Sequence, residues 1–247
     1  MNNSDLAQIL IRAVEEADSS ERLIDAVQDL AAAHLEESVP TLIAALGYNN
    51  PGAAVAAVDG LIAIGEAAVS PLLKLIDDYN YGARAWALRA LAGIGDVRAL
   101  DTLFEAAKTD FSLSVRRAAT RGLGTLLWHQ LPPEKVESVQ TQVLEALLLI
   151  SKDPEWVVRY AAVTSLETLA IAMPAAVNNP VSLPDRASRI TNQLQQMLDT
   201  DVDLGVRTRV KFAQEKIQQQ QHQEVFAPKR KLQETEVDVP HRGGGRR

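Results

Sequence analysis

The sequence predicts an all-α protein, a HEAT-like α-solenoid of about five to six helix pairs. A block of 13 residues recurs at intervals of roughly 30 to 48 residues, and apolar side chains recur at every fourth position inside it. Clusters of Gly, Asn, Asp and Pro separate the copies. A unit repeated at this interval cannot bury its apolar face alone, so its neighbours stack against it into an open array.

Each copy of the block predicts one helix. The first, fifth and ninth positions are small or aliphatic, as in Val115, Ala119 and Leu123, and a spacing of four places them on one buried stripe. Frequent alanine in this stripe allows neighbouring helix axes to approach closely. The copies begin at Ala53, Ala83, Val115 and Val158, with a worn copy at Val206 and a degenerate one over residues 22–34.

A second apolar stripe accompanies each block, so the repeating unit is a pair of helices. Leu100, Leu103 and Phe104 form such a stripe ahead of the copy at Val115. Turn residues such as those of 47–52 and Asp153-Pro154 end one helix and cap the next.

Two intervals are longer than the others, and the end of the chain differs in composition. The extra residues, at 128–139 and 173–186, contain prolines and predict loops. Residues 218–247 have no helical periodicity and predict a disordered tail. This tail carries about +2, which leaves −9 for the rest of a chain whose net charge is −7. We therefore expect a solenoid over 1–217 and a mildly basic, disordered tail over 218–247.

Composition narrows the function. The chain contains 0 Cys, which excludes disulfides, thiolate catalysis and thiolate metal sites. Its four His are scattered, so we expect no metal site. The acidic body argues against nucleic-acid binding. No apolar run is long enough to span a membrane and no signal peptide is present, so we expect a cytoplasmic protein.

Arginines at the second position of the block predict a structural ladder. Each follows an aspartate-bearing turn, and bidentate pairing of Arg with turn carboxylates and helix-end carbonyls of a neighbouring unit would fix the register of the repeats. These arginines are Arg84, Arg116, Arg159 and Arg207.

The third, seventh and fourteenth positions predict a different face. Steps of four and seven residues keep them on one side of a helix. Arg117, Arg121 and Trp128 occupy them in one copy, with Arg89 and Tyr160 at single positions in two others. Arginine beside aromatic rings suits an anionic, conjugated ligand or an acidic protein surface. A solvated face with tryptophans that fill gaps in the core remains the alternative.

Four segments resemble a known family: LGYNNPGAAVAAVDGL (46–61), DDYNYGARAWALRALAGIGD (77–96), FSLSVRRAATRGLG (111–124) and DPEWVVRYAAV (153–163). They are similar to the F-type subunit of the heterodimeric E/F phycobilin lyases of cyanobacteria, over about residues 6–170. The resemblance implies a bilin lyase of the carbon-sulfur lyase class, which acts with an E-type partner. It attaches phycocyanobilin by a thioether bond to a cysteine of the phycocyanin α subunit.

The resemblance also implies how the reaction divides between the partners. The cysteine of the apo-phycocyanin α subunit is the nucleophile, the ring A ethylidene of the linear tetrapyrrole is the electrophile, and no cofactor is needed. Relatives that also isomerise the bilin are associated with a His-Cys motif. Because this chain has 0 Cys, we expect ligation without isomerisation.

Side-chain chemistry selects the candidate bilin-binding residues. Arginine would bind the propionates, and aromatic rings would stack on the pyrroles. Asp110 or Glu155 is a weaker candidate as proton donor. Two alternatives stay open: a phycobilisome-docking HEAT-repeat protein for assembly or degradation without ligase chemistry, and a generic HEAT scaffold. The candidate bilin-binding residues are Tyr79, Tyr81, Trp86, Arg89, Arg117, Arg121, Trp128, Trp156 and Tyr160.

Overall fold

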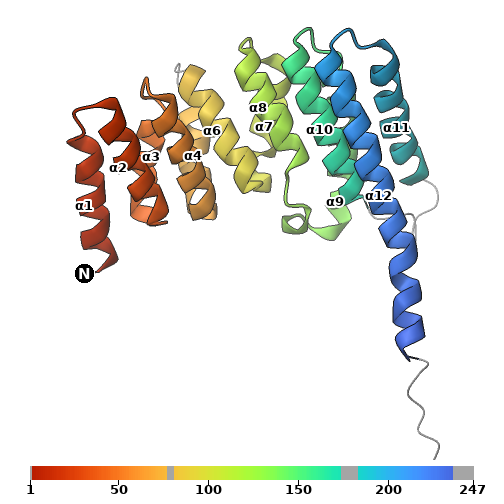
Figure 1. The fold of residues 1–247 in the computed structure, drawn as a ribbon, viewed down its shortest axis with the longest axis horizontal. Coiled ribbons are helices and arrows are strands. Elements are labelled where there is room, and N and C mark those ends of the chain that lie inside the picture. The colour runs from red at the N-terminus through yellow and green to blue at the C-terminus, as the bar shows by residue number, and fades with distance from the viewer. Residues whose placement is uncertain (1, 77–80, 174–182, 236–247) are drawn as a thin grey trace, which may run out of the picture.

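The computed structural model describes residues 2–76, 81–173 and 183–235 and shows an open arc of stacked helices (Figure 1). Within these residues, 12 α-helices form consecutive pairs, which confirms the predicted all-α solenoid. They are α1 (Asn3–Glu15), α2 (Ser20–Ala32), α3 (Val39–Ala45), α4 (Pro51–Ile64), α5 (Glu66–Ile76), α6 (Tyr81–Ile94), α7 (Leu100–Thr109), α8 (Leu113–Gly124), α9 (Pro133–Ile150), α10 (Trp156–Ala172), α11 (Leu183–Thr200) and α12 (Leu204–Thr235).

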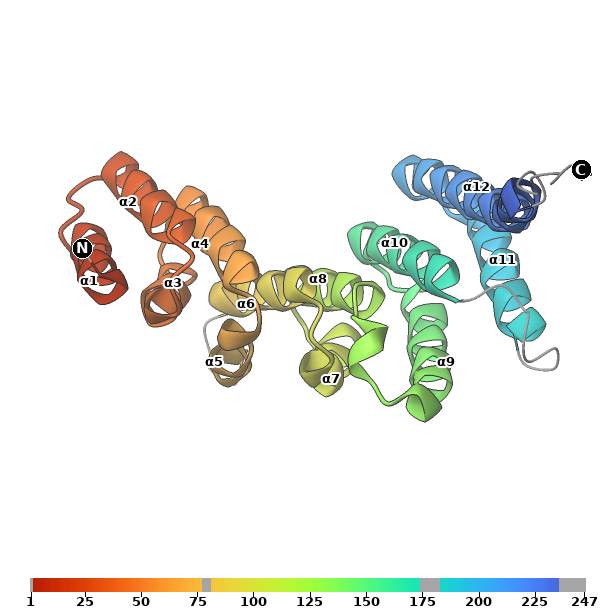
Figure 2. The same cartoon turned by 90° about the horizontal axis from the view of Figure 1, so that it is seen from below.

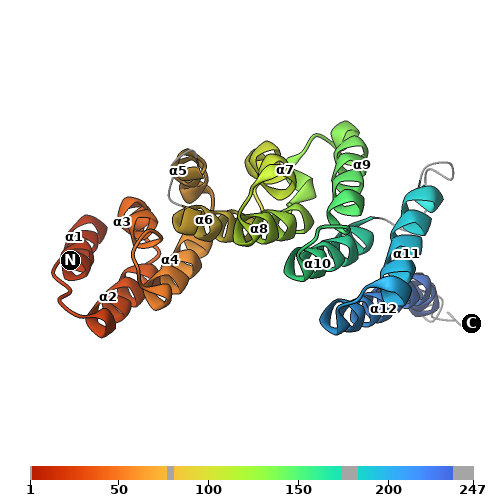
Figure 3. The same ribbon diagram turned by 90° about the horizontal axis from the view of Figure 1, so that it is seen from above.

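The even-numbered helices form one layer and the odd-numbered helices the other. Seen from below and from above, α2, α4, α6, α8, α10 and α12 follow the concave side of the arc, and the odd-numbered helices cover the convex side (Figures 2 and 3). Each even-numbered helix packs on the next one. None of the described helices combines the length and apolar character needed to cross a membrane.

Small residues allow the close packing of the concave layer. Ala53, Ala57 and Leu61 of the repeated block are fully buried, as the spacing of four predicts. Gly60 and Gly124 occupy points where two helices meet. A Cβ added at Gly124 would lie 2.7 Å from Ser165 Cα in α10, so a larger residue there would push the two helices apart.

An arginine ladder runs along the edge of the solenoid that is formed by the turns connecting each odd-numbered helix to the even-numbered helix that follows it. Arg116 donates from Nε and Nη2 to the two carboxylate oxygens of Asp153 at 2.8 and 3.1 Å. Its Nη1 donates to the carbonyls of Asp110 and Phe111, both at 3.0 Å. One guanidinium thus joins the turn before its own helix to the turn of the next pair.

The same arrangement repeats on either side. Arg84 pairs with Asp110, and Arg159 donates to both carboxylate oxygens of Asp201 at 2.7 and 2.9 Å. The predicted structural role is therefore confirmed for Arg84, Arg116 and Arg159. Arg207 lies on α12 in the last described pair, so it has no following turn to bind.

The ladder perturbs the titration of its own groups. The hydrogen bonds from the Arg159 guanidinium hold the pKa of Asp201 below its ordinary value, despite burial that would raise it. The same bonds raise the pKa of Arg159. Asp201 is therefore ionised near neutral pH, and its charge stabilises the folded state.

Two predicted loops are shorter than expected. After α8 the chain forms a short 3-10 helix, η3 (Trp128–Gln130), and α9 begins at Pro133, so most of the predicted loop 128–139 is helical. The extra length instead makes α9 a long helix, which Pro can begin because its missing N–H lies in the first turn. In the second interval, residues 174–182 lie outside the described part of the chain, and α11 begins at Leu183.

The prediction of a disordered tail from residue 218 is wrong as far as Thr235, because α12 continues to that residue. Figure 1 shows its second half leaving the solenoid (blue). The sequence of this stretch is rich in Gln, Glu and Lys, whose unbranched side chains lose little freedom in a helix. An apolar period in a helix arises only where one face of the helix is buried. This part of α12 leaves the core, so it has no apolar stripe although it is helical. Residues 236–247 lie outside the described part of the chain.

Candidate functional site

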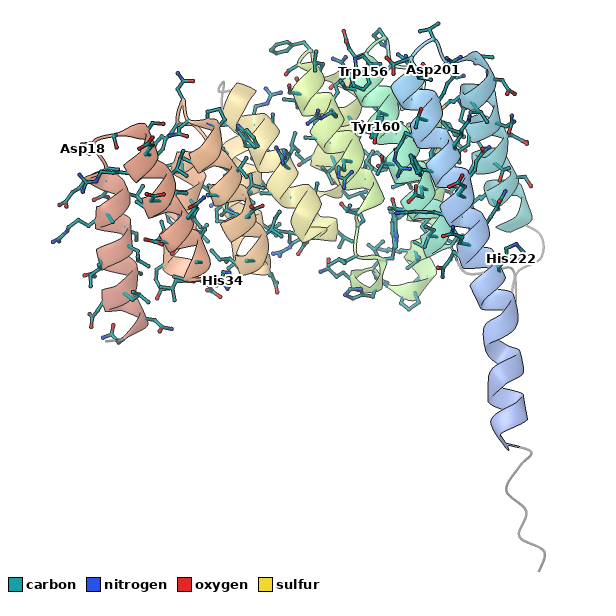
Figure 4. All side chains as sticks on the ribbon, in the orientation of Figure 1. Asp18, His34, Trp156, Tyr160, Asp201 and His222 are labelled. Carbon is teal, nitrogen blue, oxygen red and sulfur yellow. The ribbon has the colours of Figure 1, made fainter. Side chains whose placement is uncertain are left out.

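The concave face contains a groove of about 810 Å³ that crosses four consecutive even-numbered helices. Figure 4 shows two of its residues, Trp156 and Tyr160, one turn apart on α10. Its lining includes the small residues Ala92, Ala118 and Ala161 between longer side chains. The lining residues are Val58, Asp59, Ile62, Arg89, Ala92, Gly93, Arg117, Ala118, Arg121, Thr125, Trp156, Val157, Tyr160, Ala161 and Thr164.

Arginines form the cationic part of the groove. Arg117 and Arg121 are exposed and lie one turn apart on α8, while Val115 and Ala119 of the same helix are buried in the core. Within the described residues neither arginine forms a salt bridge. Arg89, also exposed, adds a third guanidinium from α6. Three exposed guanidinium groups suit a ligand that carries carboxylates.

Aromatic side chains of α10 form a wall at the C-terminal end of the groove. Trp156 and Tyr160 on α10 keep 47% and 38% of their surface exposed, which is high for aromatic residues of this size. Exposed rings beside guanidinium groups offer stacking surfaces to a planar conjugated ligand.

Helix α12 supports this aromatic wall. The Arg209 guanidinium lies 6.0 Å from the centre of the Tyr160 ring, and its Nε donates to Thr164 Oγ1 at 3.1 Å. Arg209 Nη1 in turn lies 2.7 Å from Oε2 of the buried Glu167 carboxylate. Lys216 Nζ lies 3.6 Å from Oε1 of the same carboxylate. The wall is therefore positioned by a charged network instead of apolar packing alone.

Asp59 on α4 is a residue that the sequence analysis missed. It is exposed and supplies the carboxylate of the groove lining. The sequence does contain a signal for it, because Asp59 occupies the seventh position of its block. The seventh positions of the next three blocks are Arg89, Arg121 and Thr164. All four seventh-position residues line the groove.

The structure brings together five of the nine predicted bilin-binding residues in this groove: Arg89, Arg117, Arg121, Trp156 and Tyr160. Trp86 does not line the groove and is partly buried against the core, with the Arg89 guanidinium 4.6 Å from its ring centre. Trp86 therefore positions the groove residue Arg89 through this cation–π contact.

Three further predicted residues are not placed in the groove. Trp128 follows the end of α8 at Gly124, so the helical spacing that linked it to Arg121 does not apply, and its ring packs against the core. The turn that carries it is fixed to the preceding repeat, where the carbonyl of Gly95 accepts the N–H of Leu127 at 2.8 Å. Tyr79 and the side chain of Tyr81 lie outside the described part of the structure.

The two weaker candidates for proton donor, Asp110 and Glu155, lie at turns before helices and do not line the groove. Asp110 pairs with Arg84 and accepts the N–H of Ser112 at 2.8 Å, so it closes a turn of the ladder. Glu155 is the residue before α10, and it does not line the groove. Asp59 is the carboxylate that a ligand in the groove would meet.

Fold and site together define a class of protein: a HEAT-repeat solenoid with a concave groove that combines cationic and aromatic side chains. The family model for HEAT repeats matches residues 39–124 and 69–167. The chain is 56% identical over 211 residues to the phycocyanobilin lyase subunit beta of Pseudanabaena tenuis, an alignment that covers 85% of this chain and 73% of the relative.

Two further comparisons agree. The chain is 61% identical over 161 residues to the phycocyanin alpha phycocyanobilin lyase CpcF of Synechocystis sp., which covers 65% of this chain and 75% of the relative. It also matches a chain in the structure of the complex of CpcE and CpcF of phycocyanin lyase from Nostoc sp., with 48% identity and a TM-score of 0.63, over 72% of this chain and 98% of that one. The chain therefore belongs to the family of F-type, or beta, subunits of the phycocyanobilin lyases.

Proposed function

We propose that the chain is one subunit of a heterodimeric bilin lyase that attaches phycocyanobilin to a cysteine of the phycocyanin α subunit, together with an E-type partner subunit. The family membership supports this reaction, and the groove supplies the observation that carries it. Three arginines, two exposed aromatic rings and one carboxylate lie along one face that spans four helices.

The reaction is an addition. The acceptor thiol adds across the ethylidene double bond of ring A: a C–S bond forms, the sulfur proton is transferred to the tetrapyrrole, and no group leaves. Oxidation states balance without a redox partner, so no cofactor is required in the proposal. Since the chain contains 0 Cys, the thiol comes from the acceptor, and we propose ligation without isomerisation.

The groove contributes orientation. Arg117 and Arg121 bind the propionates of the bilin, Trp156 and Tyr160 stack on its rings, and Asp59 accepts hydrogen bonds from pyrrole N–H groups. Holding a flexible tetrapyrrole in one conformation presents one face of ring A to the thiol, and such positioning is a large source of rate acceleration. We place the reaction in the cytoplasm, where the acceptor cysteine stays reduced.

Co-expression tests the proposal. The chain, an E-type partner, the apo-phycocyanin α subunit and a phycocyanobilin source are produced together, and covalent bilin on the α subunit is measured by fluorescence after denaturing electrophoresis. We expect attachment that needs both subunits and is lost when the acceptor Cys is replaced by Ser. Absence of thiol-dependent attachment with every component present would overturn the proposal, and capture of assembled phycobilisomes without transfer would favour a docking role.

A further inference from the structure

Large apolar side chains form a row along the edge of the solenoid that carries the arginine ladder. They lie at the turns that lead into α8, α10 and α12, and Figure 4 labels Trp156 and Asp201 at this edge. We call this row the apolar rim. Its members and their exposed fractions are Phe111 (68%), Leu113 (42%), Trp156 (47%), Val202 (90%) and Leu204 (68%).

The rim is built by the repeat itself. Each turn starts with the ladder carboxylate, Asp110, Asp153 or Asp201, and an apolar residue follows three positions later. Because a guanidinium of the preceding pair binds each carboxylate, the turns keep a fixed spacing and the charges of these three carboxylates are neutralised. Exposed apolar side chains at turns of fixed spacing are suited to contact with another protein.

The rim is continuous with the groove through Trp156. This residue lines the groove and also stands in the rim at the start of α10. Its ring extends to the next turn, since a Cβ placed on Gly205 would lie 3.8 Å from Trp156 Cζ3. A molecule that covers the rim therefore borders the mouth of the groove.

We propose that the apolar rim is the docking surface for the apo-phycocyanin α subunit, through an apolar surface beside its acceptor cysteine. This inference rests on the proposed function, because the acceptor thiol must reach a bilin held between Trp156 and the groove arginines. A short row of side chains also fits a substrate that has to be released after one transfer, whereas a permanent partner subunit requires a larger interface.

The test is the triple substitution Leu113→Ser, Val202→Ser and Leu204→Ser, which leaves the groove-lining Trp156 intact. Transfer rates of the bilin-loaded heterodimer are measured against the concentration of apo-α subunit, and direct binding of that subunit is measured without bilin. We expect the half-maximal concentration and the dissociation constant to rise about tenfold. The rate at saturating acceptor, non-covalent bilin absorbance and co-elution with the E-type partner should stay unchanged.

Leu149→Ser is the matched control, because Leu149 is 63% exposed on α9, outside the rim. Val202→Ser alone serves if the triple variant melts at a lower temperature. An unchanged acceptor dependence overturns the docking inference while the proposed function stands, and loss of co-elution overturns it by assigning the rim to the partner subunit. If the wild-type heterodimer attaches no bilin, the proposed function fails and the inference fails with it.

Discussion

Arg116 and Arg117 are adjacent in the sequence and belong to two regions with opposite physical character. Arg116 lies in the ladder, 13% exposed, and makes a bidentate pair with Asp153, which is 10% exposed. Arg117 lies in the groove, is exposed, and pairs with no carboxylate within the described residues. A rotation of about 100° around α8 separates the two side chains.

The difference teaches which charges stabilise the fold and which remain available for a ligand. A partly buried guanidinium that is fully paired cannot be removed without leaving a carboxylate unpaired in a poorly solvated place. An exposed guanidinium costs little to hold in water, so its removal hardly affects folding. The ladder fixes the positions of the turns, and the groove arginines use the rigid frame that results.

The largest effect is expected from Arg116→Ala. It leaves the Asp153 carboxylate without its bidentate donor, and the free energy of unfolding should fall by about 3 kcal/mol. Chemical denaturation followed by circular dichroism measures the change. The matched control is the neighbouring Arg117→Ala, which should change stability by less than about 0.5 kcal/mol. Equal losses in the two variants would erase the distinction between ladder and groove.

The reverse pattern is expected when Arg117→Ala is combined with Arg121→Ala. Two charge-assisted hydrogen bonds at about 1.5 kcal/mol each predict about a hundredfold weaker binding of phycocyanobilin. Absorbance titration of the heterodimer measures it, and melting should stay unchanged. Lys74→Ala with Lys152→Ala removes the same charge from exposed positions that do not line the groove and should leave binding intact. Lower helicity in the double arginine variant would show a structural role instead.

A smaller effect is expected from Asp59→Asn. An amide retains one acceptor oxygen but loses the charge that favours pyrrole N–H donors, so bilin affinity should fall about tenfold. The visible absorbance band of bound bilin should shift as well, because the carboxylate acts on the conjugated system. Asp59→Glu is expected to restore both the affinity and the band. Affinity that falls equally in Asp59→Glu would show that the site requires shape and not charge.

The smallest effect is expected from acidification of the ladder. The pKa of Asp201 is lower in the folded state than its ordinary value of 3.8, so the unfolded chain binds more protons as the pH falls towards that value. The stability from this group is complete above about pH 5 and is lost as the pH drops through the lowered pKa.

Comparison with Asp201→Asn isolates this contribution. The difference in unfolding free energy between wild type and variant should be largest near neutral pH and shrink on acidification. Its slope should not exceed about 1.4 kcal/mol per pH unit, the limit for one proton. A difference that does not change between pH 7 and pH 3 would mean that the Arg159–Asp201 pair is not the origin of the effect.

Much of the architecture could be predicted from the sequence because burial in a helix has a period. Val115, Ala119 and Leu123 are buried as their spacing required, and Arg84, Arg116 and Arg159 make the ladder that their place after turn aspartates indicated. The apolar period did not predict helix where a helix is not buried against the core. Helix α12 continues beyond residue 218 without an apolar stripe, and α9 begins inside a stretch that its prolines marked as a loop.

The sequence by itself therefore determined the helix pairs, the structural arginines and the face on which Arg117, Arg121 and Tyr160 lie, because each depends on local spacing. Only the tertiary structure decided which helices contribute to one groove. The stacking of four pairs brings Asp59 of α4 onto the same face as Trp156 of α10, while the early end of α8 turns Trp128 towards the core. Distances between repeats follow from how helices pack, and spacing along the chain does not record them.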